Sequence, residues 1–474
     1  MIDLAFQDVL DSTGARPICG NRDVRLTGVS TDTRTIQAND LYLALSGPQF
    51  DGNAFIAQAI EGGAAGLLLR EDHGLTGLTE LPIPVAVHRS PRRALSDLAR
   101  WHRSRLRLPV IGITGSCGKT STKDMLVQLL EPFRSVHGSP ASFNNDIGVP
   151  RTVLGANPTT EVMVVEMGTN APGEIAGLCR TARPTAGILT HLGPAHLEGL
   201  GSVQGVAREK SALIASLPPD GFCVLNADCP WTEQLAAMTS ARAIRFGLSS
   251  KGSDLYASDV WFHGAGTTFR LHAAPGWGLV RSHEVTVPFL GLHMVQNLLA
   301  ALAACAGLGL DLADLLEHLG SLRGSRRRLE RRTGAGITVY DDCYNANPDS
   351  AKASVRVLAG LHGHRRRVLV LGDMLELGAD AARLHHDVGV AAAAAGLDLV
   401  VPVGEFAADI SRGINKVKGA RPKVLAFDSP EDAIQGLPKE ICEGDLVMVK
   451  ASRGARLERL VERLLDPEAS EVKA

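Results

Sequence analysis

Several features that would place this chain in a special class of protein are missing from it. Its eight cysteines include no Cys-x-x-Cys pair, so we expect no zinc site, and a reducing cytoplasm fits this cysteine usage. Neither sign of charge is in excess, since 49 Lys and Arg stand against 51 Asp and Glu. The near-neutral balance gives no electrostatic reason to expect a nucleic acid or a membrane as a partner.

Long apolar runs and a targeting signal are also missing. The alanine-rich run from Val388 to Gly404 is interrupted by Asp398, and its apolar stretches are too short to cross a membrane, so we interpret it as a buried helix followed by a strand. The first residues, M-I-D-L-A-F-Q-D, contain no basic region followed by an apolar one, so we expect no signal peptide and a cytoplasmic location. With 474 residues, 45% of them hydrophobic, the chain has an ordinary globular composition and suggests about three domains.

What the chain does contain is a glycine-rich loop between an apolar strand and a helical pattern. The apolar run that begins at Val110 leads into T-G-S-C-G-K-T-S (Thr114 to Ser121). Glycines let the N–H groups of such a loop point at one phosphate, and the following helix adds its dipole. Lys119 and Thr120 can then reach the terminal phosphates and a Mg²⁺. The loop predicts a nucleoside triphosphate site, although Ile113 stands where the general motif has its first glycine; a plain glycine turn is the alternative.

Polar residues follow two further strands of the same region. Glu166 ends the apolar stretch V-M-V-V-E, and His196 lies in the loop after A-G-I-L-T. The carboxyl ends of strands in such a sheet face the ligand crevice, so Glu166 is a candidate Mg²⁺ ligand, and His196 at the same edge favours a metal site. Either residue alone could be structural. By composition Lys210 is a solvated surface lysine, and Asn297 either begins a helix or contacts the nucleotide.

The order of the expected elements favours an α/β chain with a mostly parallel central sheet. Before it, the polar stretches 28–34 and 50–56 fit binding loops and capped turns equally well. Alternation over 252–288 indicates antiparallel strands that decorate the central domain. After the basic cluster 323–332, interpreted as a solvated linker, strands and helices alternate as in a doubly wound sheet. The expected domains are residues 1–108, 109–322 and 323–474.

Taken together, these stretches resemble the Mur ligase family. The resemblance rests, in chain order, on T-G-S-C-G-K-T, F-N-N-D-I-G-V-P, E-M-G, G-P-A-H-L-E-G-L-G-S and G-L-H-M-V-Q-N. Two later stretches, D-D-C-Y-N-A-N-P-D-S and G-D-M-L-E-L-G, are similar to the members that add a dipeptide. The resemblance implies a smaller N-terminal domain for the UDP end of the substrate, a central P-loop ATPase and a C-terminal Rossmann-like domain. It also implies an ATP-dependent ligase that joins D-alanyl-D-alanine to UDP-N-acetylmuramoyl-tripeptide through an acyl phosphate, in the cytoplasmic stage of cell wall synthesis.

The resemblance further implies roles for individual residues. Thr120 and Glu166 would hold one Mg²⁺, and His196 with a carbamylated Lys210 a second, which replaces the surface interpretation of that lysine. The implied contacts to ATP are Gly115, Ser116, Cys117, Gly118, Lys119, Thr120, Ser121, Asn145, Asn297, Arg328 and Asp342, with Arg326 and Arg327 as alternatives to Arg328. The implied contacts to the UDP end are Ser30, Asp32, Arg34, Asp51, Gly52 and Asn53, and those to the cleft shared with the dipeptide are Asn345 and Asn347.

Two positions depart from common family residues in the nucleotide site, and other functions stay open. Cys117 should cost little because the loop binds phosphate through backbone N–H groups, whereas Met294 weakens the expected hydrogen bonding around the adenine. A folylpolyglutamate synthetase-like ligase is disfavoured by the domain ahead of the loop. A protein that only closes on ATP is disfavoured by the two metal sites. No stretch resembles a dedicated dimer segment, so a monomer is expected.

Overall fold

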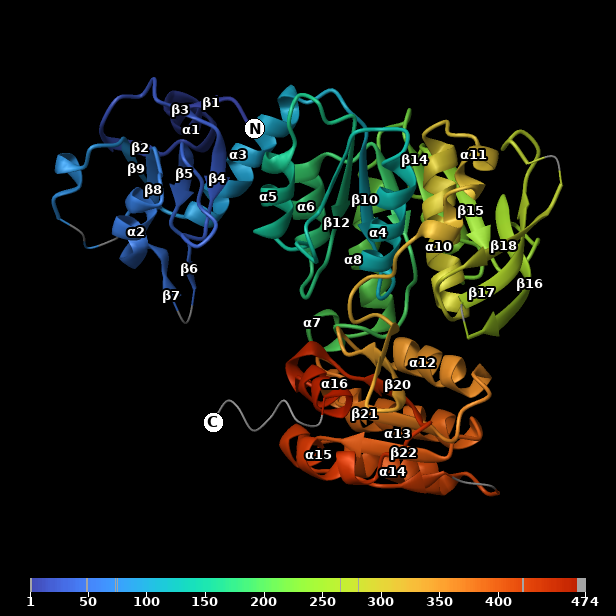
Figure 1. Ribbon diagram of the computed structural model, residues 1–474. Coiled ribbons are helices and arrows are strands. Elements are labelled where there is room, and N and C mark those ends of the chain that lie inside the picture. Colours follow the sequence, from blue (N-terminus) through green and yellow to red (C-terminus); the bar gives the residue numbers. More distant parts are fainter. Residues whose placement is uncertain are drawn as a thin grey trace.

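The computed structural model describes residues 2–47, 50–72, 74, 76–264, 266–279, 281–419 and 422–466. Figure 1 shows three α/β bodies, with the N-terminal body (blue) beside the central one (green to yellow) and the C-terminal body (orange to red) below them. The α/β architecture expected from the sequence is present. Within the described residues, no helix is long and apolar enough to span a membrane.

The N-terminal body is a five-stranded sheet, parallel except for its edge strand β2. In sheet order its strands are β2 (Arg16–Cys19), β9 (Val85–His88), β8 (Gly66–Arg70), β5 (Asp40–Leu43) and β4 (Gly28–Ser30). Its helices are α1 (Phe6–Thr13), α2 (Ile56–Glu61) and α3 (Pro91–Arg105). Helix α3 begins where the Ser90 side chain accepts a hydrogen bond from Arg93 N, with Pro91 in the first turn, as helix starts favour.

The central body is a nine-stranded sheet in which β11 to β16 are parallel and β17 and β18 are antiparallel. Its strands are, in sheet order, β11 (Val136–Gly138), β12 (Val162–Glu166), β10 (Val110–Thr114), β13 (Ala186–Leu189), β14 (Phe222–Asn226), β15 (Arg242–Gly247), β16 (Leu255–His263), β17 (Gly266–Ala273) and β18 (His283–Val287). The expected antiparallel strands are confirmed, and β16 joins them to β15 in one sheet. The helices are α4 (Lys119–Leu130), α5 (Gly148–Gly155), α6 (Glu174–Ala182), α7 (Leu197–Leu200), α8 (Val203–Ala215), α9 (Thr232–Ala236), α10 (Leu292–Gly307) and α11 (Leu312–Leu316).

The C-terminal body is a six-stranded sheet, parallel except for its first strand. Its strands are, in sheet order, β19 (Glu330–Gly334), β20 (Ile337–Asp342), β24 (Leu446–Lys450), β21 (Arg367–Gly372), β22 (Leu399–Val403) and β23 (Lys423–Val424). The helices are α12 (Pro348–Gly360), α13 (Ala381–Ala394), α14 (Ala407–Lys416), α15 (Pro430–Gly436) and α16 (Glu458–Leu465). The doubly wound pattern is confirmed, and the alanine-rich run is the buried helix α13 followed by β22, as expected.

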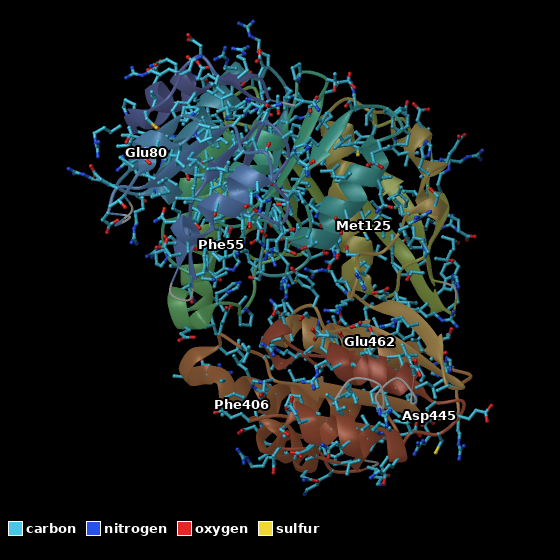
Figure 2. All side chains as sticks on the ribbon, turned by 60° about the vertical axis from the view of Figure 1, so that its left-hand side comes forward. Phe55, Glu80, Met125, Phe406, Asp445 and Glu462 are labelled. Carbon is cyan, nitrogen blue, oxygen red and sulfur yellow. The ribbon has the colours of Figure 1, made fainter. Side chains whose placement is uncertain are left out.

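The interpretation of residues 323–332 as a solvated linker is wrong at its end. Strand β19 begins at Glu330 and pairs with β20. One of its charged side chains is paired, since the guanidinium group of Arg332 lies 2.7 Å from the carboxylate of Glu462 on α16. Figure 2 labels Glu462 on the side of the C-terminal body that faces the central one. The charged residues of β19 therefore resemble a basic linker in the sequence, although they form an edge strand that α16 covers on one side.

Candidate functional site

The phosphate loop connects β10 to α4 and packs against α10. Gly118 precedes α4 with a φ of 82°, a backbone conformation that favours glycine. A Cβ at this position would collide with the side-chain oxygen of Asn297, so the polar residue of α10 lies directly against the loop. The ammonium group of Lys119 donates to Gly115 O at 2.9 Å. Burial lowers the pKa of Lys119, and the charge of Glu166 opposes this shift.

Glu166 ends β12 beside this loop with one carboxylate oxygen unpaired. Its Oε1 accepts from Asn144 Nδ2 at 2.9 Å, whereas Oε2 is buried without a hydrogen-bond partner. A buried charged oxygen is costly unless a cation or a donor compensates it. Thr120 and Glu166 line the same hollow, and an oxygen-rich pair of this kind suits Mg²⁺, which keeps phosphate and water ligands. The described residues contain no group of three His, Cys, Asp or Glu that could hold a metal ion.

Lys210 on α8 is buried, and its amine has no hydrogen-bond partner. Burial, and second the charge of Lys119, hold the pKa of Lys210 well below its usual value. The neighbouring Glu209 is occupied, since its carboxylate accepts from Gly173 N at 2.6 Å and Ile175 N at 2.7 Å. Both causes favour the uncharged form of this amine, which is the form of a lysine that can react as a nucleophile.

Side chains of the C-terminal body reach into this site. Asn347 caps α12 by accepting from Ser350 N at 2.8 Å, and its Nδ2 donates to Ser116 O at 3.3 Å. Arg328 donates to Thr120 Oγ1 at 2.9 Å. The guanidinium group of Arg328 stacks on the ring of Tyr344, with its central carbon 4.3 Å from the ring centre. A cleft of 830 Å³ between the two bodies is lined by Arg328, Tyr344, Asn345 and Asn347 together with Ser116, Thr120 and His196.

His196 takes part in a second contact between these bodies. It precedes α7 with a φ of 53°, and its Nδ1 lies 2.6 Å from Glu376 Oε2. The hydrogen bond to His196 lowers the pKa of Glu376. Nearby, His191 Nε2 lies 3.0 Å from Asp349 Oδ2. Histidine and carboxylate pairs thus lie at the edge of the cleft.

Two of the predicted nucleotide contacts are engaged in other interactions. Asp342 lies behind the cleft lining, where it binds the ammonium group of Lys450 at 2.8 Å and accepts from Ser354 Oγ at 2.7 Å. The side chain of Asn145 accepts from Ile147 N and Gly148 N and caps α5. Of the other predicted contacts, Cys117 lines the hollow around the loop, and Ser121 is buried on α4 outside this lining.

The alternatives for the predicted arginine differ in their contacts. Arg328 contacts the phosphate loop through Thr120, while Arg327 lies 3.3 Å from the carboxylate of Glu458 on α16. Arg326 lines the cleft. The geometry therefore favours Arg328 as the arginine nearest the loop.

The predicted contacts to the UDP end gather around a buried tyrosine of the N-terminal body. Burial, and then the charges of Asp32 and Asp51, raise the pKa of Tyr42 to about 12. Its hydroxyl donates to Gly52 O at 3.0 Å. Asn53 is buried with neither side-chain atom hydrogen-bonded. None of these residues lines the cleft around the phosphate loop.

Two further residues of this N-terminal group bind each other. Arg34 donates to the carboxylate of Asp32 at 2.6 Å, and this hydrogen bond is the main cause that lowers the pKa of Asp32 to about 2. Ser30 Oγ donates to Asp32 O at 2.9 Å. The stretch 28–34 is therefore strand β4 followed by a preformed turn, in which Arg34 remains exposed.

Sequence reasoning missed several side chains that complete the site. Asn144 stands next to the predicted Asn145, and Glu376 lies within the G-D-M-L-E-L-G stretch. Tyr344 interrupts the polar run of the C-terminal loop, and its hydroxyl hydrogen-bonds the hydroxyl of Ser142 in the central body. These stretches were recognised, but the contacts depend on how two domains meet.

Comparison with known proteins extends over all three bodies. Three family models match the chain: "Mur ligase family, catalytic domain" over residues 25–103, "Mur ligase middle domain" over 113–305 and "Mur ligase, glutamate ligase domain" over 327–453. The UDP-N-acetylmuramoyl-tripeptide–D-alanyl-D-alanine ligase of Bacillus subtilis is 35% identical over 440 residues, 93% of either chain. The ligase of the same name from Escherichia coli is 35% identical over 446 residues, 93% of this chain and 94% of the relative.

Solved structures agree with these relatives. A crystal structure of MurF from Acinetobacter baumannii is similar with a TM-score of 0.86 at 29% identity, and covers 98% of this chain and 99% of that one. The MurF ligase from Thermotoga maritima in complex with ADP is similar with a TM-score of 0.79 at 27% identity, over 92% and 96% of the two chains.

Proposed function

Since this chain belongs to the Mur ligase family, we propose that it is the ATP-dependent ligase that adds D-alanyl-D-alanine to UDP-N-acetylmuramoyl-tripeptide in peptidoglycan synthesis. The observation that carries the proposal is a meeting of unpaired groups at a phosphate loop. The free carboxylate oxygen of Glu166 and the free amine of Lys210 are both buried, and the charge of Lys119 acts on both residues. Relatives that carry this activity by name cover the chain nearly from end to end.

The chemistry follows from the need to activate a carboxylate before an amine can attack it. The carboxylate of the tripeptide attacks the γ-phosphate of ATP, which gives an acyl phosphate and ADP; the amine of the dipeptide then displaces phosphate and forms the amide. Lys119 and the N–H groups before α4 orient the phosphates and offset their charge. Closure of the C-terminal loop over Ser116 excludes water that would hydrolyse the acyl phosphate.

We assign two Mg²⁺ sites. Thr120 and Glu166 would hold one ion, and His196 with carbamylated Lys210 the other. Bound there, Mg²⁺ would supply a Lewis acid for the transferring phosphoryl group. In the carbamate the amine nitrogen of Lys210 bonds the carbon of CO₂ and loses a proton, which turns a lysine into an anion. Lys210→Ala would lose activity that added acetate restores in part, whereas full activity of the variant would contradict this role.

The remaining assignments complete the proposal. Asn297 is the contact to the adenine end of the nucleotide, and the residues around Tyr42 bind the UDP end. Asn345 and Asn347 line the cleft that receives the dipeptide. The domains are bounded near residues 108 and 322, and the chain acts as a monomer in the cytoplasm.

The test is phosphate release by the purified protein with ATP and Mg²⁺. UDP-N-acetylmuramoyl-tripeptide is supplied with and without D-alanyl-D-alanine, and the products are weighed by mass spectrometry. We expect release that needs both substrates and a product heavier by the dipeptide. Release without that product would point to another acceptor or amine, and no release with both substrates present would contradict a ligase.

A further inference from the structure

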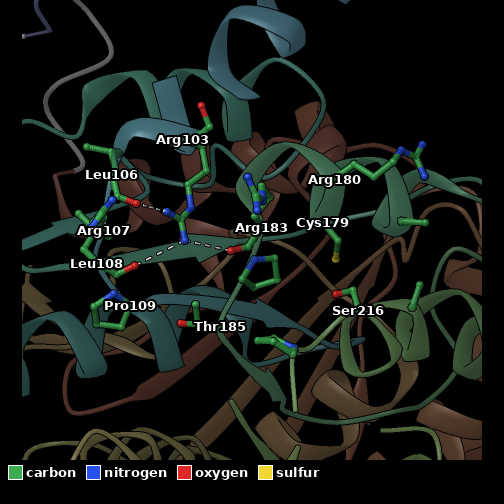
Figure 3. A pocket seen from close by; sticks show the side chains of 15 residues that line it. Arg103, Leu106, Arg107, Leu108, Pro109, Cys179, Arg180, Arg183, Thr185 and Ser216 are labelled. Atoms are coloured by element: carbon green, nitrogen blue, oxygen red, sulfur yellow. Dashed lines mark hydrogen bonds between the residues drawn. The ribbon is translucent and has the colours of Figure 1, made fainter. Parts of the chain in front are cut away.

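A second large cavity lies on the edge of the central sheet opposite the phosphate loop. Figure 3 shows it between the residues that follow α3, the turn after α6 and helix α8, and its volume is 980 Å³. Its lining includes Leu108 and Pro109, just before β10, and Thr185, just before β13. The phosphate loop follows the other end of β10. Since a five-residue strand rises by about 3.3 Å per residue, roughly 16 Å separate the two sites.

Four arginines and no carboxylate are among the described residues that line this cavity. Arg103 is the buried one, and its guanidinium group is held by backbone carbonyls, at 2.8 Å from Ala182 O, 2.7 Å from Leu106 O and 3.1 Å from Arg183 O. Burial, and second the charge of Arg183, lower the pKa of Arg103. Two cations therefore lie close enough to repel each other, a cost that an anion between them would remove.

The other three arginines are exposed and have no opposite charge of their own. Arg107, Arg180 and Arg183 form no ion pair with any carboxylate in the described part of the chain, whereas Arg93 and Arg100, earlier on α3, both pair with Asp97. The three come from separate segments, the linker after α3, helix α6 and the turn that follows it. Figure 3 shows Arg107 and Arg183 on either side of the Arg103 guanidinium group, and Arg180 farther along the rim with its side chain extending outward. Three separate segments thus contribute arginines without an ion pair to the lining of one cavity.

The rest of the lining is largely apolar. It consists of Leu106, Leu108, Pro109, Ala176, Pro184, Ala212 and Pro218 with the small polar residues Ser104, Cys179, Thr185 and Ser216. A concave site of this size, with an apolar lining and a few convergent charges, is typical of small-molecule pockets. Guanidinium groups bind phosphate oxygens in pairs, which gives such a pocket its selectivity.

We propose that this cavity binds a small soluble organic anion that carries phosphate groups, at a site separate from those of ATP and the peptide substrates. The phosphate groups would lie between Arg107, Arg180 and Arg183, and the organic part against the apolar lining. A soluble ligand is favoured over a membrane surface because the guanidinium groups surround a hollow and not a flat face. The proposal concerns none of the residues assigned to ligase chemistry, so it can be tested independently of that function.

The test is calorimetric titration of the full-length protein with inorganic tripolyphosphate. Saturating ADP and UDP are present, so that the phosphate loop and the UDP site are already filled. We expect one further binding site per chain. The double variant Arg107→Ala/Arg180→Ala should weaken tripolyphosphate binding by about tenfold or more, because each guanidinium group that is removed takes away a charge-assisted pair of hydrogen bonds. Arg103 is left intact because it holds backbone carbonyls, and Arg183 because its charge acts on Arg103.

A matched control removes the same charge from the same edge of the sheet. Arg134→Ala/Arg242→Ala changes two exposed arginines, one just before β11 and one at the start of β15, that do not line the cavity. The control should bind tripolyphosphate as the unchanged protein does. The milder Arg180→Gln, with thermal unfolding of every variant, distinguishes loss of the site from loss of the fold.

Three results would overturn the proposal. The first is the absence of a further site in the unchanged protein. The second is equal weakening in both double variants, which would mean that only net charge matters. The third is binding to phosphatidylglycerol vesicles, lost in Arg107→Ala/Arg180→Ala, without binding of tripolyphosphate, which would identify a membrane contact. All three results are binding measurements made with the substrate sites filled, so they do not depend on whether the protein is active as a ligase.

Discussion

Two buried lysines of the central domain have opposite surroundings. The amine of Lys123 donates to Ser139 O at 3.0 Å and Ala141 O at 2.6 Å. The amine of Lys210, equally buried, has no partner. A buried polar group without a hydrogen bond costs about 1–3 kcal/mol, whereas a satisfied one contributes to stability. Lys210 therefore destabilises the fold at a position where an uncharged amine is chemically useful.

We expect Lys210→Met to raise the free energy of unfolding by about 1–3 kcal/mol at neutral pH, and Lys123→Met to lower it by a similar amount. The pKa of Lys210 is lowered in the folded state, so the unfolded chain binds an extra proton below the usual lysine pKa of about 10.4. The stability of the unchanged protein then rises with pH, and the advantage of Lys210→Met shrinks towards pH 10. Urea unfolding at several pH values, without bicarbonate, Mg²⁺ or nucleotide, measures this, and a variant less stable than the unchanged protein at pH 7 would contradict it.

The carboxylate of Glu166 permits a substitution that changes charge and little else. In Glu166→Gln the bond from Asn144 is kept, and the unpaired oxygen no longer carries charge. We expect stability to be unchanged or higher, the Mg²⁺ concentration for half-maximal rate to rise by about tenfold or more, and kcat to fall by about 10²–10³. Glu209→Gln is the control: both its oxygens bind the start of α6, so it should lower stability and leave the Mg²⁺ dependence alone.

Residues of the site differ in how far the sequence could reveal them. Glu166 was predictable because its position at the end of an apolar strand fixes the sheet edge on which it lies. The stretch R-E-K-S gives no sign that Lys210 is buried, because helical spacing does not say which face of α8 packs inward; only the family resemblance corrected this. The contacts of Asn347 with Ser116 and of Glu376 with His196 depend on the docking of two domains, which no local pattern records.

At the scale of elements, two helices of the central domain begin at a glycine with the same unusual backbone. Gly118 precedes α4 with a φ of 82°, and Gly173 precedes α6 with a φ of 86°. A Cβ on Gly173 would meet nothing within 4 Å, while one on Gly118 would collide with Asn297. Both positions require a left-handed backbone, and Gly118 also has no room for a side chain.

Alanine at each glycine should separate the effect of backbone strain from the effect of the steric contact with Asn297. Both Gly118→Ala and Gly173→Ala should lower the free energy of unfolding by about 1–2 kcal/mol, because left-handed backbone is strained for alanine. Gly118→Ala alone should also weaken ATP binding, by about tenfold or more, because the loop or Asn297 must shift away from the phosphate position. Thermal unfolding and calorimetric titration with ATP measure the two effects, and equal loss of ATP binding in both variants would contradict the steric explanation.

Elements with clear local signals were predicted well, and those defined by pairing were not. The ends of α3 (Pro91–Arg105) can be recognised in the sequence, because Ser90 and Pro91 mark its start and basic residues occupy its last turn. Strand β19 was missed because its charged residues resemble a basic linker, and the ion pair of Arg332 with Glu462 forms only when α16 lies beside it. The parallel pairing of β15 with β16 joins the antiparallel strands to the main sheet, and it is a long-range contact without a sequence period.

At the scale of the whole molecule, some apolar clusters cross a domain junction and others lie within one domain. Helix α3 packs along α5 and α6, and its buried Leu98 belongs to one apolar cluster with Val153 of α5 and Leu178 of α6. The C-terminal domain also shares a cluster with the central domain, but Leu460 of α16 belongs to another cluster, which is built only from C-terminal residues. The N-terminal and central domains thus share a core, and part of the C-terminal core is independent of them.

This difference predicts how a cavity spreads through the chain. Leu98→Ala and Leu460→Ala each remove the same atoms from a side chain with no exposed surface and should cost about 2–5 kcal/mol. Because the core around Leu98 crosses a junction, Leu98→Ala should speed hydrogen exchange in α1 and also in α5 and α6, and leave the C-terminal domain protected. Leu460→Ala should do the reverse, with faster exchange confined to peptides from β19 to α16. If Leu98→Ala left α5 and α6 as protected as before, the N-terminal and central domains would be separate folding units, and closure on substrate would have to be explained by two hinges instead of one.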